Sequence, residues 1–508
     1  MSQYIESLSV VGRYPERRRR RLIPRKVWLQ YALLLAFYGT FFTFWQLEPV
    51  PWNVHASSIL LMAVCLYPIM SWRAKGSHGP PMFELICLAY ALQFAIPVYL
   101  QPNELMIQDK LVLISWSDVQ KSQLLTTLGV CALVIAYTIT ARSRFSMMCP
   151  KLDLPLDPRK RNMFLKFAVS VGVGLAFMQA IGRAPDNSGP LGAIVRVLTN
   201  QLNLAIILLA YEIYRERHRN KRTMLMLYGL TAVAFLLGLS SGMLEGALIP
   251  LALLFIVRWD STRKLAWRYL IIAAALFLLL NPIKIQYRAQ AWFGDENMSL
   301  PARIGLWVDL AKDNLTGELE QPGTGGPAGF VQRATSRFDL LHRFAYIGQM
   351  TPEVVPFYEG ETYAYLVYGW IPRIIWPNKP EASDASRQMD LDYGFLYDVP
   401  GQSASIGIGQ LPEAWVNFGA PGILIVMILQ GIFFALLRGM LTGPRSEGGQ
   451  AIYLSIMVSF LNGIGSVAVV FFTSLFQNTF ANALVLRPFA KSFKARRTDT
   501  PGRRVFPS

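Results

Sequence analysis

A stiff, positively charged run at residues 369–380 is the first candidate for chemistry in this chain. It presents Arg373 and Lys379 on a backbone that also holds three prolines. Proline fixes its own φ and restrains the residue before it, so both cations have little backbone freedom. Trp370 and Trp376 flank them with flat amphipathic rings, which suit a membrane interface or the face of a sugar. The same pattern also fits a plain interfacial anchor.

A carboxylate follows at Glu413, within residues 411–419. Asn417 lies four positions later, which places it on the same face if the segment is helical. Because an apolar stretch begins directly afterwards, we expect both side chains at a membrane surface. Together with the cations of the preceding run, they favour an anionic ligand that is partly carbohydrate or linked to a lipid.

Further cations lie upstream. Lys284 and Arg288 are four residues apart and share a face if the helix before them continues. Arg196 stands with several amides in the outer half of an apolar stretch. Polar groups at that depth are costly unless they meet a partner or a wet cavity. This stretch therefore either lines a cavity or makes hydrogen bonds between helices.

Residues 331–350 are predicted to form an amphipathic helix on the membrane surface. Arg337 lies on the polar side of this helix, and Asp339, His342 and Arg343 add a carboxylate, an imidazole and a further cation within about a turn of one another. Arginines suit a pyrophosphate because the planar guanidinium makes bidentate, charge-assisted hydrogen bonds. The alternative is a surface helix whose charges simply lie in water.

Composition sets the class of the protein. Of the 508 residues, 53% are apolar and only 16% are charged, which is well below the share of charged residues in soluble domains. The net charge of +17 comes from basic residues in short loops, so it does not indicate nucleic-acid binding. The four cysteines show no CxxC spacing and indicate neither a disulfide framework nor a metal site.

Apolar stretches recur along the chain and several reach about 20 residues, the length that crosses a bilayer. We expect about twelve transmembrane helices. They are predicted at residues 27–45, 53–72, 82–100, 119–140, 163–181, 191–214, 223–239, 244–257, 267–282 and 420–437, with two short spans within 451–486.

The positive-inside rule orients these helices. The basic tails at residues 1–26 and 487–508 are expected in the cytoplasm, and the long polar loop at residues 283–419 on the outside. Nine helices would lie within 27–282 and three within 420–486. The fold class is therefore predicted to be an all-α polytopic membrane protein with one large late outer loop.

In topology and in several motifs, the chain resembles the Wzy-type O-antigen and exopolysaccharide repeat-unit polymerases. The run at 371–380 is similar to that family's Pro-Arg-x-x-Trp-Pro-x-Lys-Pro signature, and residues 413–419 are similar to its Glu-x-x-x-Asn-Phe-Gly segment. Residues 284–288 and 337–339 share less specific features with it. One departure stands out, because members often carry an arginine in the outer turn at 240–246, where this chain has Met243 and Glu245.

The resemblance implies a bacterial inner-membrane glycosyltransferase with a GT-C-like architecture. It would polymerise undecaprenyl-pyrophosphate-linked oligosaccharides at the periplasmic face, without a metal or another cofactor. Its partners would be these lipid-linked glycans, the phospholipid bilayer and a chain-length-regulating membrane protein, but no nucleic acid.

The implied chemistry assigns roles to the candidate residues. Arginines would stabilise the leaving pyrophosphate, and Glu413 is the first candidate for the base that accepts the proton of the acceptor hydroxyl, followed by Asp339 and His342. Each could instead be the salt-bridge partner of a nearby arginine. The residues proposed to bind pyrophosphate or glycan are Arg288, Arg337, Arg373, Lys379, Lys284, Arg196, Trp376 and Asn417.

Other classes of protein share parts of this pattern. A ligase that moves lipid-linked glycan to another acceptor would have the same architecture and the same arginines. A flippase for lipid-linked oligosaccharides would also have many spans, but would not need a large outer loop rich in arginine, tryptophan and carboxylates. A structural partner of a secretion complex would explain the topology alone.

Overall fold

Long helices make up most of the protein in the computed structural model, as the apolar stretches predict. In a bilayer every backbone N–H and C=O must be paired within the chain, and a helix does this locally. The structure describes residues 23–75, 80–143, 148–152, 154–180, 189–215, 220–262, 264–265, 267–293, 298–316, 332, 335–369, 371, 375–376, 378–398, 405–442 and 446–491.

The helices and strands follow one another in a fixed order along the chain. The first half contains α2 (Arg25–Phe44), α3 (Trp52–Lys75), α4 (Met82–Phe94), α5 (Pro97–Leu100), β1 (Glu104–Ile107), β2 (Lys110–Leu113), α6 (Trp116–Arg142), α8 (Pro158–Ala180), α9 (Gly189–Tyr214), α10 (Lys221–Ser240) and α11 (Leu244–Thr262). The second half contains α12 (Trp267–Leu280), α13 (Lys284–Phe293), α14 (Leu300–Thr316), η1 (Ser336–Phe338), α16 (Leu341–Met350), α17 (Glu361–Gly369), α18 (Ala382–Asp392), α19 (Gln410–Leu441), α20 (Glu447–Gly463), α21 (Ala468–Leu486) and η2 (Arg487–Phe489).

Eight helical segments in the described part of the chain are long and apolar enough to cross a membrane, and α12 with α13 makes a ninth if this pair, bent by 61°, is one span. The prediction of a helical membrane protein is confirmed at this level. Three further predicted spans form α8, α11 and α20, which do not meet the same test. Helix α20, for example, has only 17 residues.

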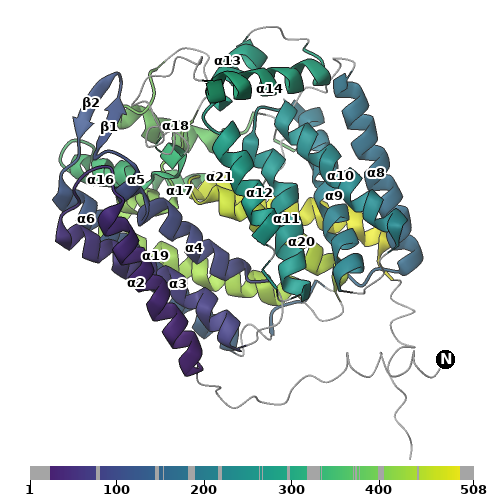
Figure 1. Cartoon of the computed structure of the whole chain (residues 1–508), viewed down its shortest axis with the longest axis horizontal. Coiled ribbons are helices and arrows are strands. Elements are labelled where there is room, and N and C mark those ends of the chain that lie inside the picture. The colour runs from purple at the N-terminus through teal and green to yellow at the C-terminus, as the bar shows by residue number, and fades with distance from the viewer. Residues whose placement is uncertain are drawn as a thin grey trace, which may run out of the picture.

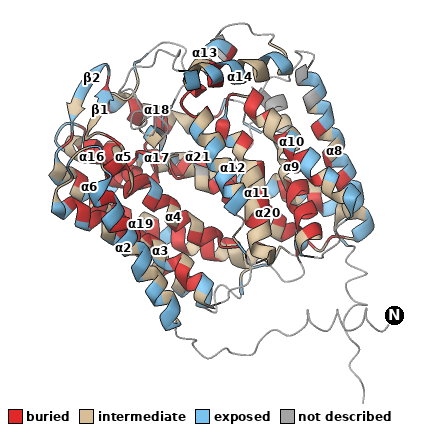
Figure 2. Ribbon diagram, viewed as in Figure 1, coloured by how far each residue is buried: buried red, intermediate tan, exposed pale blue. Residues whose placement is uncertain are grey.

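The membrane helices run side by side in Figure 1, with α2, α3, α4, α6 and α19 on one side and α8 to α12 on the other. Helix α19 packs along α6. Gly431 makes this close approach possible, because a Cβ there would lie 2.5 Å from the carbonyl oxygen of Leu133. Most buried residues in Figure 2 lie where these helices face one another.

The predicted outer loop is folded into helices rather than extended. Helices α13 and α14 lie across the upper edge of the view in Figure 1, and α16, α17 and α18 lie above the ends of α6 and α4. A second, smaller core forms beneath α13 and α14, where Tyr287 stacks on Trp307 with ring centroids 4.3 Å apart. A two-stranded antiparallel hairpin, β1–β2, stands beside this layer and was not predicted.

Candidate functional site

Glu413 lies in the first turn of α19 and is fully buried. Its Oε1 accepts a hydrogen bond from the Thr362 hydroxyl of α17 at 3.0 Å, and its Oε2 accepts one from the backbone N–H of Ala468 at 2.5 Å. Within the described residues, no lysine or arginine forms an ion pair with it. The carboxylate therefore joins the start of α19 to α17 and to the start of α21.

Asn417 completes what we call the Glu413 cluster, formed by Glu413, Asn417, Thr362 and the N–H of Ala468. The Asn417 amide donates to the Thr362 hydroxyl and to the Glu413 carbonyl, both at 2.8 Å, and accepts from the Gly360 N–H at 2.9 Å. The predicted pairing of Glu413 and Asn417 on one helical face is thus present. Both side chains hold backbone and helices in place, and neither faces open solvent.

Gly419 separates this cluster from the membrane-spanning part of α19. Its φ of 63° and ψ of −150° are not helical, so the chain kinks there although the hydrogen-bonded helix runs from Gln410 to Leu441. Only glycine adopts this conformation readily. The span predicted from residue 420 therefore has a helical segment of about two turns in front of it, and this segment holds Glu413 and Asn417.

Asp339 and His342 form a second buried pair at the start of α16. The His342 Nδ1 lies 2.9 Å from both carboxylate oxygens of Asp339, and the His342 backbone N–H donates to Oδ1 at 3.1 Å. His342 is fully buried, and its Nε2 has no hydrogen-bond partner within the described part of the chain. A buried polar atom without a partner costs stability, so it marks a functional candidate. We call Asp339 and His342 the His342 pair.

Two contacts place the His342 pair next to the Glu413 cluster. Leu340, between Asp339 and α16, lies with its Cδ1 about 3.2 Å from where a Cβ on Gly409 would stand, directly before α19. The Phe344 and Trp415 rings meet edge to face with centroids 6.4 Å apart. The structure thus brings all three predicted base candidates, Glu413, Asp339 and His342, to one region of the molecule.

A third carboxylate, Asp390 of α18, lies behind this region and was not predicted. Its Oδ2 accepts hydrogen bonds from the backbone N–H groups of Ile406 and Gly407, at 2.8 and 3.4 Å. Burial raises the pKa of Asp390 above its ordinary value, and these two donors together with Arg343 oppose that shift. Asp390 fixes the segment at residues 406–407 that leads into α19. Nothing in its spacing along the sequence indicates this role.

Lys379 is buried and its ammonium group donates to the carbonyl oxygens of Gly369 and Ile371, at 2.9 and 2.8 Å. The lysine thus holds the end of the proline-rich run at 369–380 against its beginning. Trp376 is exposed and its ring meets that of Tyr368 at 5.9 Å. Arg373 lies outside the described residues. The predicted roles of these residues in binding pyrophosphate or glycan remain predictions.

Arg288 of α13 reaches the turn between α10 and α11. Its Nε donates to the Gly242 carbonyl at 3.0 Å, and its Nη2 lies 2.9 Å from the Met243 sulfur. Arg303 of α14, which was not predicted, donates to the Ser240 carbonyl of the same turn at 3.0 Å. The outer turn that lacks an arginine of its own is therefore contacted by two arginines from the helices above it. Lys284, four residues before Arg288, is buried.

The side chains of Arg196 and Arg337 lie outside the described residues. The backbone of Arg337 is in η1, where the neighbouring Phe338 ring lies 5.2 Å from Phe277 of α12. The predicted surface helix at 331–350 is shorter than expected, because α16 begins only at Leu341 and buries its apolar side against α6. This packing buries His342.

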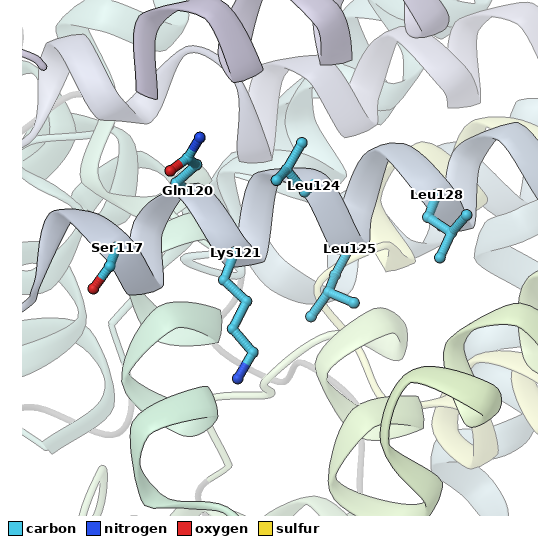
Figure 3. Close-up of a pocket in the computed structure, with 6 residues that line it drawn as sticks. All are labelled: Ser117, Gln120, Lys121, Leu124, Leu125 and Leu128. Carbon is cyan, nitrogen blue, oxygen red and sulfur yellow. The ribbon is translucent and has the colours of Figure 1, made fainter. Parts of the chain in front are cut away.

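An open groove of about 370 Å³ follows one face of α6 and is shown in Figure 3. Lys121 extends from it on the same side as Leu125, and its ammonium group lies 5.0 Å from the centre of the Trp415 ring. Exposed leucines, Leu124 and Leu128, continue the groove along the span. This is the pattern of a lysine that keeps its charge at the membrane interface above a lipid-facing helix.

The arrangement of the His342 pair is capable of acid–base chemistry. An imidazole held by a carboxylate can accept a proton at its other nitrogen, and the partner stabilises the resulting charge. Among the described residues, no group of three His, Cys, Asp or Glu side chains is placed to hold a metal ion.

Comparison with known proteins gives one match. No curated protein and no solved structure matches the chain. A family model described as "Domain of unknown function (DUF8712)" matches residues 104–476, which include the Glu413 cluster, the His342 pair and Arg288. The chain belongs to this family, DUF8712.

Proposed function

We propose that this chain is a membrane glycosyltransferase that polymerises oligosaccharide repeat units carried on undecaprenyl pyrophosphate. The observation that carries the proposal is the His342 pair, a fully buried imidazole with Asp339 at 2.9 Å and no described partner on Nε2. Its position at the outer end of membrane helices suits a substrate whose lipid stays in the bilayer while its glycan extends outside.

The proposed reaction forms one glycosidic bond and breaks one glycosyl–phosphate bond. A hydroxyl of the incoming repeat unit attacks the anomeric carbon of the growing glycan, and its proton passes to Nε2 of His342. Undecaprenyl pyrophosphate leaves with the electron pair of the broken C–O bond. Asp339 holds the imidazole by Nδ1 and stabilises the imidazolium that forms. Because Nε2 is covered by neighbouring side chains, the acceptor would have to displace some of them.

His342 replaces Glu413 as the first candidate for the base. Both oxygens of Glu413 already accept hydrogen bonds from groups that hold helices together. A general base needs an atom that is not already engaged in a hydrogen bond, and Nε2 of His342 has no partner within the described part of the chain. Glu413 is then a structural residue that positions the start of α19.

Negative charge on the leaving pyrophosphate requires fixed cations. Arg288, Arg337 and Arg373 are proposed for this role. The ammonium group of Lys379 already donates to two carbonyls, so we assign it to the shape of its loop. Arg303 likewise donates to the Met298 and Ser240 carbonyls and is assigned to holding α14 on the α10–α11 turn.

The proposal includes a location and partners. The chain would lie in a bacterial inner membrane with about twelve spans in a GT-C-like arrangement, both termini in the cytoplasm and residues 283–419 in the periplasm. A membrane protein that regulates chain length would be a partner.

The test uses the full chain in nanodiscs with a synthetic lipid-linked repeat unit, and reads the products as a ladder on a gel. Wild type should give a ladder, and His342→Ala should lose it. Gln349→Ala, on the same helix but bonded to Asp118, is the matched control and should keep it. Transfer to a different acceptor without a ladder would indicate a ligase. Movement of the lipid across a vesicle without any transfer would overturn the enzymatic proposal.

A further inference from the structure

A pocket of about 220 Å³ lies between α20, α21 and the start of α11. These helices lie close together in the centre of Figure 1. The polar side chains that line it are Glu245, Ser459, Ser466, Ser474 and Asn478. Ser459 and Ser474 are exposed although their neighbours Val458, Phe460 and Leu475 are buried, as expected for side chains that face a pocket.

The pocket extends from the turn between α20 and α21 along α21. Asn478 lies ten residues into α21, which corresponds to about 15 Å along the helix. Its Oδ1 accepts a hydrogen bond from Asn200 of α9 at 3.0 Å, which holds the amide in place. The Ser459 hydroxyl donates to the Ser455 carbonyl at 3.1 Å, which leaves its oxygen able to accept. Several polar side chains gathered around one pocket between apolar helices favour a ligand that carries hydroxyl or amide groups.

Apolar side chains line the pocket together with these polar groups. Two of them, Phe460 and Phe471, are buried and meet edge to face with ring centroids 3.8 Å apart. A sugar ring carries both C–H groups and hydroxyls. A lining that mixes apolar side chains with hydroxyl, amide and carboxylate groups suits both parts.

Charge and size narrow the choice of ligand. No lysine, arginine or histidine stands among the described residues that line the pocket, whereas Glu245 brings a carboxylate. A phosphate would be repelled there, but a neutral or amino sugar would not. Pockets for drug-sized ligands measure about 300–1,000 Å³. At about 220 Å³ this pocket is smaller, which favours a single sugar ring over an oligosaccharide.

The turn between α20 and α21 is shared by this pocket and the Glu413 cluster. Ser466 of this turn lines the pocket, while Ala468, two residues later, donates its N–H to Glu413. On the other side of the turn, the Gln410 amide donates to the Gly463 carbonyl at 3.3 Å. A ligand in the pocket would thus be separated from the candidate site by one turn of backbone.

We propose that this pocket binds a single sugar ring of the lipid-linked glycan and contributes to the selection of glycosylated lipid over bare lipid. The inference rests on the proposed function for the identity of the glycan. It assigns sugar recognition to Glu245, Ser459, Ser474 and Asn478, and leaves the pyrophosphate to the arginines of the outer layer.

The test measures binding without turnover. The full chain in nanodiscs is titrated with undecaprenyl pyrophosphate, either bare or carrying one glucose, galactose or N-acetylglucosamine. Wild type should bind at least one glycosylated lipid about tenfold more tightly than the bare lipid, a ratio that a few added hydrogen bonds supply. Ser459→Leu with Ser474→Leu should abolish this ratio and leave binding of the bare lipid unchanged. Gln477→Leu, exposed on α21 and outside the pocket lining, is the matched control and should keep the ratio.

Several results would overturn the inference. They are a wild-type ratio near one for all three sugars, a double variant that keeps the wild-type ratio, or a double variant that weakens bare and glycosylated lipid equally. If the double variant does not fold, Ser474→Ala is measured instead, with about a threefold loss of the ratio expected from one lost hydrogen bond. An unchanged ratio would then contradict the inference. Failure of the proposed function is distinguishable, because wild type would then make no ladder yet keep its preference for glycosylated lipid.

Discussion

Substitutions of Glu413 test whether its carboxylate has a structural or a catalytic role. In Glu413→Ala, the Ala468 N–H and the Thr362 hydroxyl both lose their acceptor inside a fully buried region. A hydrogen bond to a charged group contributes about 1.5–3 kcal/mol, and an orphaned buried donor costs about 1–3 kcal/mol. We therefore expect Glu413→Ala to lower the free energy of unfolding by about 3–5 kcal/mol.

We expect Glu413→Gln to lower the free energy of unfolding much less than Glu413→Ala does. The amide oxygen can accept from the Ala468 N–H, and the amide nitrogen can donate to the Thr362 hydroxyl. That hydroxyl has a second acceptor position besides the one used by Asn417. Both contacts survive, so the expected loss of stability is about 1 kcal/mol or less. If Glu413 is structural, this variant also keeps its transfer activity.

Two assays on the same preparations check this reasoning. Unfolding in mixed micelles of increasing SDS content gives the stability of wild type and both variants, and the polymer ladder gives the rate of transfer. A Glu413→Gln protein that is as stable as wild type but slower by a factor of about 10² or more would refute the reasoning. Glu413 would then be the base, and His342 would be a packing residue.

Three further predictions concern the segments around the site. Lys379→Met removes two charge-assisted hydrogen bonds, including that to the Gly369 carbonyl, and should lower the free energy of unfolding by about 2 kcal/mol in the same SDS titration. An unchanged midpoint would show that these two bonds do not hold the loop together. Gly407→Ala forces a φ of 77° on alanine and brings its Cβ within 2.7 Å of the Gly465 carbonyl oxygen, so it should lower the free energy of unfolding by at least about 2 kcal/mol. A midpoint equal to that of wild type would contradict this prediction. Burial raises the pKa of Asp390, so its ionisation destabilises the fold as pH rises through that pKa. Relative to Asp390→Asn, wild type should gain thermal stability as pH falls from neutral towards the ordinary carboxyl range, and a constant difference would contradict this.

Much of the fold could be predicted because its signals are local. The apolar stretches at 27–45, 53–72, 119–140 and 223–239 differ from α2, α3, α6 and α10 by only a few residues at each end. Length and hydropathy decide whether a segment lies in the bilayer, and both are read directly from the sequence.

Segments with mixed signals were predicted less well. The predicted span at 420–437 begins directly after the kink at Gly419, but the helical segment from Gln410 that precedes it was not predicted to join it in one element. The hairpin β1–β2 was missed because its turn holds Gln108 and Asp109, both at positive φ, in place of an Asn-Gly or Asp-Gly pair.

The candidate site depends on contacts between distant residues, so only part of it was predictable. Residue type and spacing identified Glu413, Asp339 and His342 as chemically capable. Sequence could not show that Thr362 and Ala468, 51 and 55 residues away, use both oxygens of Glu413. Nor could it show that His342 is buried with a free Nε2. The order of the three candidates therefore changed once packing was known.

Chemical rescue of His342→Ala tests the central claim most directly. Transfer of a synthetic lipid-linked repeat unit is timed for wild type and for the variant, with and without added imidazole. The account predicts a loss of about 10²–10⁴-fold, the usual contribution of a positioned general base, and a partial recovery with imidazole that rises with its concentration. A His342→Ala protein that transfers at the wild-type rate would contradict it, and so would a folded but inactive variant that imidazole does not rescue.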